Sequence, residues 1–355
     1  MARQDLRVVE VLTLTRAARE EVVGVLDANE LEYVLTDESG GDSEMATISF
    51  PLPTQTVEHI QTRLEELDID DELYTIVIDP EAVVSDRFGD SDDPYDEVRG
   101  LGYQGISRSE LISTATDMVP DRTIYLLMTA ISAVVATAGV LLNSLSVLVG
   151  SMVIAPLIGP LMATSVATVL DEPNLYRRSV RYQIQGGAVA LASAIGFATI
   201  VKFTDLVDAG FNVSHLLQVS SHTAPNFLLV VVALGAGFAG ALSLSTSGTI
   251  DLVGVMIAAA VMPPIGVVGV GVAWVSLSAV VGGVAVVLMN VFSMTLAAII
   301  SLWYLGYHPE SMADVRRARG TMLVRISTLG CAIVALVILL ARVTNSGLTE
   351  AIPLL

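Results

Sequence analysis

The sequence predicts a mainly α-helical, polytopic membrane protein of about seven helices, preceded by a small α+β domain. Its mean hydropathy is +0.68 and 53% of its residues are hydrophobic, yet its formal net charge is −19. This acidity is confined to one part of the chain. Residues 1–121 hold 29 of the 37 acidic residues and 8 of the 18 basic ones, whereas residues 122–355 have a net charge of +2. An acidic, water-soluble head and an apolar membrane body are therefore expected.

The head, residues 1–85, is predicted to be a ferredoxin-like cytoplasmic domain with the element order βαββαβ. Alternating apolar residues predict strands, and apolar residues at helical spacing predict helices. The expected strands are 6–14, 32–37, 45–50 and 73–78, and the expected helices are 16–28 and 56–67. Such a sandwich packs two helices on one face of an antiparallel sheet. A small cytoplasmic ligand for this domain is expected from fold analogy alone.

An acidic linker and pre-membrane segment is predicted over residues 86–121. The stretch 86–109 is rich in Gly, Asp and Ser, which is typical of a linker. Its aspartates could chelate a hard cation, but their spacing lacks the glycine and glutamate of a calcium loop. The histidines also show no metal-ligand spacing, so the sequence predicts no metal site and no cofactor.

Two features of composition bear on the cell and its partners. Lys202 is the only lysine, and an acidic surface with almost no lysine favours adaptation to a high-salt cytoplasm, where salt screens self-repulsion. The alternative is simply an acidic domain. Nucleic acid is not expected as a partner, because phosphate binding needs clustered Lys and Arg. Cys331 is the only cysteine, which excludes an intrachain disulfide. Membrane lipids are the expected surroundings of the apolar body.

The membrane domain, residues 122–345, contains seven apolar stretches long enough to cross a bilayer. They cover about 123–142, 145–170, 184–203, 226–245, 251–274, 277–305 and 322–342. Arginines gather in the loops 171–183 and 306–321, whereas the loop 204–225 has neither Lys nor Arg. The positive-inside rule then places the N-terminus in the cytoplasm and the C-terminus outside a cell membrane.

A duplicated segment predicts an inverted repeat. Residues 148–160 (LVGSMVIAPLIGP) and 252–264 (LVGVMIAAAVMPP) share six identities at an offset of 104 positions. This offset spans three helices, an odd number, so the second copy must enter the bilayer from the opposite side. Repeats of about 122–203 and 226–305 are expected to be related in a 3+3 arrangement, with the helix 322–342 as an addition.

Prolines and glycines predict that the second and fifth spans are both broken. A proline removes a backbone donor and frees a carbonyl oxygen, which persists in a bilayer only where protein or water covers it. Two such breaks would meet near the midplane and form a substrate path, although proline kinks that serve packing alone are the alternative. The residues predicted for this path are Ser151, Pro156, Gly159 and Pro160 near the first break, Pro263, Pro264 and Gly266 at the second, Asn290 in the sixth span and Asn143 in the first turn.

Three stretches resemble one known family. They are ISRSELISTATD at 106–117, TAGVLLNSLSVLVGSMVIAPLIGPLM at 137–162 and VGVMIAAAVMPPIGVVGVGVA at 253–273. Together they resemble the uncharacterised hydrophobic-domain family, domain of unknown function 389, over roughly residues 100–305. The acidic head is similar to that of its haloarchaeal members. The resemblance implies no activity, because the family has no agreed function.

Two hypotheses about function follow. In the first, the protein is a transporter or channel for a small solute or ion, with its path at the crossing of the broken helices. In the second, it is a structural or ligand-sensing membrane protein without transport. A homo-oligomer is expected in either case, because the helices are rich in Gly and Ala. No catalytic constellation is found in the spans, so an enzyme is not expected.

Overall fold

The computed structural model describes residues 6–37, 45–67, 69, 73–80, 106–204, 227–246, 250–309 and 312–345. The chain divides into two compact units, Met1–Leu111 and Ile112–Leu355. Each unit is considered by itself below. Most of the predicted linker, residues 86–105, and nearly all of the predicted outer loop 204–225 lie outside the described residues.

The first unit contains a four-stranded antiparallel sheet and two helices in the order βαββαβ. The elements are β1 (Leu6–Thr13), α1 (Arg16–Ala28), β2 (Val34–Asp37), β3 (Ala46–Pro53), α2 (Thr54–Glu65) and β4 (Leu73–Ile78). The strand order is β2-β3-β1-β4, and each neighbouring pair is antiparallel. The strands and helices predicted for the head therefore exist, with ends that differ by a few residues.

One face of this sheet carries the hydrophobic core. Alternate residues of β1 and β3, such as Val9, Val11 and Ile48, pack with Leu26 of α1 and Ile60 of α2. All five are fully buried, at 1% exposure or less. Both helices thus cover the same face, because strand residues at a period of two share one side of a sheet.

A short helix, α4 (Arg108–Asp117), lies within the predicted pre-membrane segment. Its first turn is attached to the sheet and to α2 by two ion pairs. Arg7, which is 1% exposed on β1, pairs with Glu110 at 3.1 Å. Arg108 pairs with Glu58 of α2, whose side chain is 8% exposed. These residues are therefore an ordered part of the first unit rather than a solvated linker.

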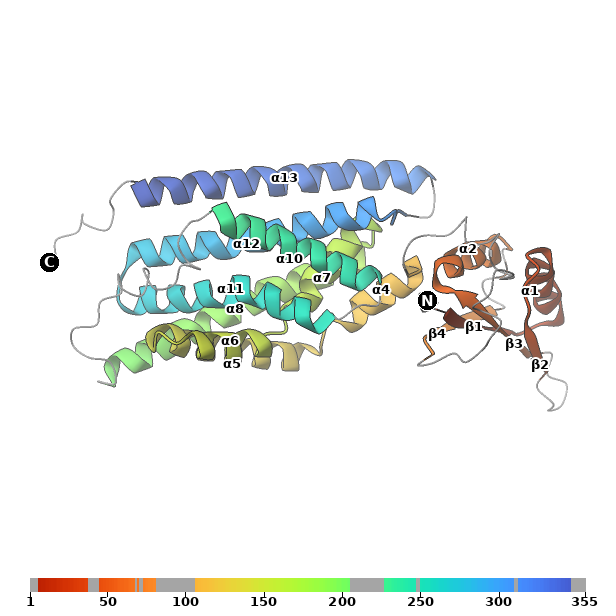
Figure 1. Ribbon diagram of the computed structural model, residues 1–355, viewed down its shortest axis with the longest axis horizontal. Helices are drawn as coiled ribbons and strands as arrows, with labels where there is room; N and C mark the ends of the chain where they lie inside the picture. Colours follow the sequence, from red (N-terminus) through yellow and green to blue (C-terminus); the bar gives the residue numbers. More distant parts are fainter. Residues whose placement is uncertain are drawn as a thin grey trace, which may run out of the picture. The chain divides into compact units, whose positions relative to one another are not determined.

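The second unit is helical and contains the predicted membrane spans (Figure 1). Its helices after α4 are α5 (Arg122–Leu141), α6 (Leu145–Ile154), α7 (Ile158–Val169), α8 (Pro173–Phe203), α10 (Phe227–Ser245), α11 (Ile250–Ala273), α12 (Leu277–Tyr304) and α13 (Met312–Asn345). Among the described residues, six helices are long and apolar enough to cross a membrane, and the bent pair α6 and α7 brings the count to seven. This agrees with a multi-pass membrane protein.

Two predicted loops are instead parts of helices. Residues 173–183 form the first turns of α8, and α13 begins at Met312 rather than near residue 322. At 31 residues, α8 is longer than the roughly 20 that a bilayer requires, and Pro173 stands in its first turn, where the missing N–H costs nothing. Arg177 and Arg181 are exposed on this extension. Charge marks the end of the apolar stretch, not the end of the helix.

The prediction that the fifth span is broken is wrong. Helix α11 continues from Ile250 to Ala273 with Pro263 and Pro264 inside it. The second span does break, as α6 and α7 are bent by 53°. Asn290 of α12 donates a hydrogen bond to the carbonyl oxygen of Ala260 within this continuous helix.

The second and fifth spans run in opposite directions. Lys202, at the end of α8, donates a 2.7 Å hydrogen bond to the carbonyl oxygen of Ala273, at the end of α11, so these two helices end on the same side. Helix α7 is joined to α8 by the turn 170–172 and packs along it, which makes α7 antiparallel to α8 and hence to α11. Figure 1 shows α11 among α5, α6, α8 and α12.

Candidate functional site

The break in the second span lies between two short helices. Helix α6 ends at Ile154, and Ala155 leaves the helical conformation with ψ at 117°. Pro156 follows, and α7 begins at Ile158. Because a proline disfavours the helical conformation in the residue before it, Pro156 explains why Ala155 is extended. The first predicted break is therefore present at the predicted residue.

The carbonyls next to the break have side-chain donors. The hydroxyl of Ser132 on α5 donates to the carbonyl oxygen of Ser151 at 2.7 Å. Ser151 is fully buried, and its own hydroxyl donates to the carbonyl oxygen of Leu148 at 2.6 Å. The hydroxyl of Ser151 thus bonds to the backbone of its own helix, while its carbonyl oxygen connects α6 to α5.

Gly159 and Pro160 form the first turn of α7. A Cβ atom on Gly159 would lie 1.9 Å from the carbonyl oxygen of Met118, just after α4, so only glycine fits. Pro160 is tolerated because the N–H groups in the first turn of a helix have no carbonyl partner within that helix. Both residues are buried.

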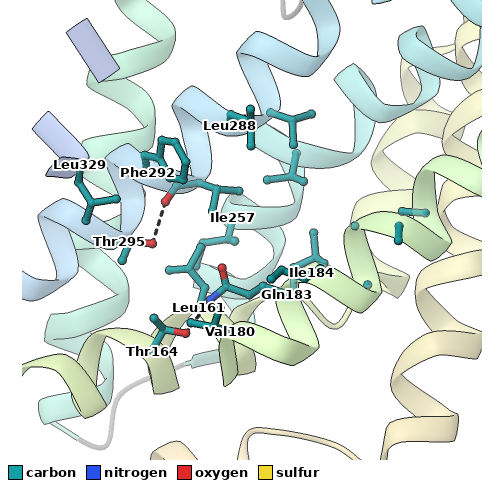
Figure 2. A pocket seen from close by; sticks show the side chains of 18 of the residues that line it. Leu161, Thr164, Val180, Gln183, Ile184, Ile257, Leu288, Phe292, Thr295 and Leu329 are labelled. Atoms are coloured by element: carbon teal, nitrogen blue, oxygen red, sulfur yellow. Dashed lines mark hydrogen bonds between the residues drawn. The ribbon is translucent and has the colours of Figure 1, made fainter. Parts of the chain in front are cut away.

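The carbonyl of Pro160 is the most heavily bonded group near the break. It accepts from the amide of Gln183 on α8 at 2.9 Å and from the hydroxyl of Thr164 at 2.7 Å. Gln183 and Thr164 also lie 2.7 Å apart, and Figure 2 shows the two side chains pointing toward each other. An amide of the third span therefore holds the first turn of α7.

The amide side chain of Asn290, on α12, likewise binds a backbone carbonyl of α11. Pro264 has no N–H to donate to the carbonyl of Ala260. Asn290 on α12 supplies the donor instead, with its Nδ2 atom 2.6 Å from that oxygen. Asn290 is 1% exposed, and its Oδ1 atom is buried without a hydrogen-bond partner in the described part of the chain. Pairing by a neighbouring helix is how a membrane helix tolerates proline.

Two further predicted residues have structural roles. A Cβ atom on Gly266 would lie 3.1 Å from the backbone of Ala136, so this glycine lets α11 approach α5 closely. Asn143 does not lie at the crossing. It is exposed, has a φ of 50° and precedes Ser144, which caps α6. Asn143 lies in the turn between the first two spans, because asparagine tolerates the left-handed conformation that ends α5 here.

The two spans meet in one buried cluster. Met152 of α6 and Ala155, just after α6, pack in it with Ala258, Val261 and Met262 of α11. The convergence of the second and fifth spans that the repeat predicts is therefore present, but the contact is apolar and closely packed. It does not itself form an open passage.

A cavity of about 710 Å³ lies beside this contact. Its walls come from α7 and α8 of the first predicted repeat and from α11 and α12 of the second, and α13 also lines it. Figure 2 shows Ile257, Leu288 and Phe292 on its apolar wall, and Gln183 with Thr164 on its polar wall. This volume is typical of a small-molecule site.

Arg325 of α13 is the charged residue of the cavity lining. Its guanidinium carbon lies 3.9 Å from the ring centre of Tyr176 on α8. Its Nη1 atom is buried and has no hydrogen-bond partner in the described parts of the chain. A cation–π contact leaves the edge of the guanidinium free to bind an anion.

None of the nine residues predicted for the path lines this cavity. Gly159, Gly266 and Asn290 lie instead at contacts between helices, and Asn143 lies in an exposed turn. The sequence analysis missed Gln183, which stood at the border of a predicted loop, and Arg325, which stood near the end of a span. Arg325 could have been found as a charged residue one turn inside a predicted span, where burial demands a partner, whereas Gln183 stood just outside one. Among the described residues no cluster of metal-ligating side chains occurs.

Comparison with known proteins gives two findings. The sequence profile of the family described as Domain of unknown function (DUF389) matches residues 152–296. An uncharacterised protein of Methanocaldococcus jannaschii is 30% identical over 217 residues, which cover 60% of this chain and 63% of that relative. The chain thus matches less than two thirds of the relative's length. No solved structure matches the chain significantly. The predicted resemblance is therefore confirmed: residues 152–296 match Domain of unknown function (DUF389), a family without a known function.

Proposed function

We propose that this protein is an integral membrane transporter or channel for a small solute, and that its path includes the cavity beside the broken second span. The observation that carries the proposal is that both halves of the domain line one cavity. A site at the interface of two halves can open to one side and then to the other as the halves move. We propose that the halves are the 3+3 inverted repeat, which the antiparallel course of α6–α7 and α11 supports.

The path that we propose differs from the one expected at the helix crossing. The crossing is filled by apolar side chains, and the freed carbonyl of Ala260 and the carbonyl of Pro160 already have donors. The break then acts as a hinge on which α7 can tilt against α8, and the solute occupies the adjacent cavity. We also propose that the N-terminal domain is cytoplasmic and the C-terminus lies outside. This proposal rests on the exposed arginines at the start of α8, because positively charged residues favour the cytoplasmic side.

Flux across vesicles tests this proposal. The full chain is reconstituted, and efflux of a panel of trapped ions and small solutes is followed under a gradient. Wild-type protein should pass at least one of them, and Pro156→Ala should slow that flux because an alanine lets α6 and α7 join. Pro53→Ala, at the end of β3 in the head, is the control. Absence of flux for every solute would remove transport.

The alternative is a structural or ligand-sensing homo-oligomer without transport. One observation favours it: β4, an edge strand, exposes a row of apolar side chains, Tyr74, Ile76 and Ile78. Edge strands with apolar residues pair readily with another chain, and a ferredoxin-like domain presents its open sheet face for such pairing. Tyr74→Lys with Ile76→Lys should then dissociate the oligomer measured by light scattering. An unchanged mass would reject the head as the assembly element.

A further inference from the structure

We propose that the cavity of the membrane domain binds a phospholipid, whose phosphate contacts Arg325 and whose acyl chain fills the apolar body. The inference concerns the same cavity as the proposed function and names the class of molecule that enters it. Binding and transport are nevertheless separable, because a lipid can occupy the cavity whether or not the domain moves.

The first argument is the state of Arg325. Its Nη1 atom is buried without a hydrogen-bond partner among the described residues, and no acidic side chain is among the residues that line the cavity. Arg325 itself is half-buried, and a charged nitrogen that is buried without a partner is costly. Phosphate oxygens match the donor geometry of a guanidinium, which binds them through two parallel hydrogen bonds. The missing partner is thus an anion from outside the described protein.

The second argument is the position of the charge along the cavity. On α8 the lining runs from Tyr176, which stacks with Arg325, to Leu191. Fifteen residues of helix correspond to about 22 Å. The charge therefore lies at one end of an elongated cavity. Beyond the amide of Gln183, the far part of α8 and the facing part of α12 contribute Leu191, Val284 and Leu288. This is the polarity of an amphipathic molecule, with one anionic end and a long apolar body.

The third argument is the helix that closes the cavity. Helix α13 is the least covered of the candidate spans, because only 6% of its most apolar 18-residue stretch is buried. Leu323 and Val324, beside Arg325, are exposed. If the domain spans a bilayer, these residues lie against acyl chains. A lipid can then reach the cavity past α13 without crossing water. Free phosphate would occupy only the charged end and leave the apolar body empty.

Photolabelling tests the inference. The full chain is reconstituted in phosphatidylcholine vesicles that contain phosphatidylglycerol with a diazirine in its acyl chain. After irradiation, labelled peptides are mapped by mass spectrometry. We expect label on the lining residues Leu288, Phe292 and Leu329. Arg325→Gln should reduce this labelling about tenfold or more, the effect of losing a hydrogen bond to a charged group.

A pair of glycines provides matched controls for the fold. Gly187 lines the cavity, and a Cβ atom there meets nothing within 4 Å, so Gly187→Leu should fill the cavity and abolish the labelling. Gly196 has the same open surroundings on the same helix but does not line the cavity, so Gly196→Leu should leave the labelling unchanged. Arg181→Gln, which removes an exposed arginine, should also leave it unchanged.

The remaining outcomes distinguish a lipid from free phosphate, and the lipid site from the proposed transport. Labelling that survives both Arg325→Gln and Gly187→Leu would overturn the lipid site. Competition by inorganic phosphate alone would show that the site binds free phosphate and would also overturn it. Labelling without flux would leave the lipid site and remove transport. Flux that is indifferent to Arg325→Gln, together with absent labelling, would leave transport and remove the lipid site.

Discussion

The second and fifth membrane spans share a sequence motif but not a shape. Residues 148–160 and 252–264 carry the same residues at six positions, yet α6 and α7 are bent by 53° whereas α11 is continuous. The prolines are also spaced differently in the two spans. Pro156 and Pro160 remove donors one helical turn apart, while Pro263 and Pro264 are adjacent and remove donors to neighbouring carbonyls.

The comparison teaches that a proline motif alone does not decide whether a membrane helix breaks. In α11 the amide of Asn290 replaces the donor that Pro264 lacks. In α7 the amide of Gln183 binds the carbonyl of Pro160 instead, which holds the helix that starts after the break. An amide of α8 thus binds α7 and an amide of α12 binds α11, and we infer that the outcome depends on which carbonyl this amide reaches.

The largest expected effect comes from closing the space at the break. Gly159→Ala places a Cβ atom 1.9 Å from the carbonyl oxygen of Met118, so backbone must move, and we expect a loss of about 3 kcal/mol in the free energy of unfolding. Gly266→Ala in α11 meets Ala136 only at 3.1 Å. The gain of about 1 kcal/mol in helix propensity should offset that contact. Thermal unfolding in detergent measures both variants. Equal losses of stability would contradict the prediction that, of these two glycines, only the one at the break has no room for a Cβ atom.

The next effect tests why α11 stays continuous. Asn290→Leu leaves the carbonyl of Ala260 buried and unpaired, which should cost about 1–3 kcal/mol. Adding Pro264→Ala restores an N–H that can donate to Ala260 within the helix, and most of the loss should return. Adding Pro263→Ala instead restores a donor to Ala259, so it should not rescue Asn290→Leu. Unfolding in detergent checks the series, and equal rescue by both alanines would reject this role of Asn290.

The smallest effect is expected in the first half. Gln183→Leu leaves the carbonyl of Pro160 with the hydroxyl of Thr164, so we expect a loss of about 1 kcal/mol or less. Because Gln183 and Thr164 also contact each other, a double-mutant cycle with Thr164→Val should give a coupling energy of about 0.5 kcal/mol or more. Additive losses would show that the two side chains act independently.

The sequence predicts the elements better than their connections. Apolar patterns locate the four strands and two helices of the head and the apolar helices of the second unit, six candidate spans and one bent pair among the described residues. The wrong boundaries lie at α8 and α13, where helices continue beyond the apolar stretch. Hydropathy reports the thickness of the bilayer and not the length of a helix.

The candidate site is less predictable for a physical reason. Pro156 predicts its break because its effect acts on the residue before it. The continuity of α11 depends on Asn290, which is 30 residues from Ala260, and a local pattern does not contain that contact. The cavity depends on Tyr176, Gln183 and Arg325 from two helices that are far apart in the sequence. Arg325 is visible in the sequence as a charged residue inside an apolar stretch, but Tyr176 and Gln183 lie in a predicted loop, and no local pattern shows that the three meet.

The division of the second span into two helices also has an electrostatic consequence. The peptide dipoles of α7 add up to roughly half an elementary positive charge at its first residues, and Ile158 lies between two lining residues of the cavity, Leu157 and Leu161. In a continuous helix this partial charge would lie at the water interface, where solvent screens it. Here it faces a weakly polarisable interior, so the field attracts anions toward the cavity and repels cations from it.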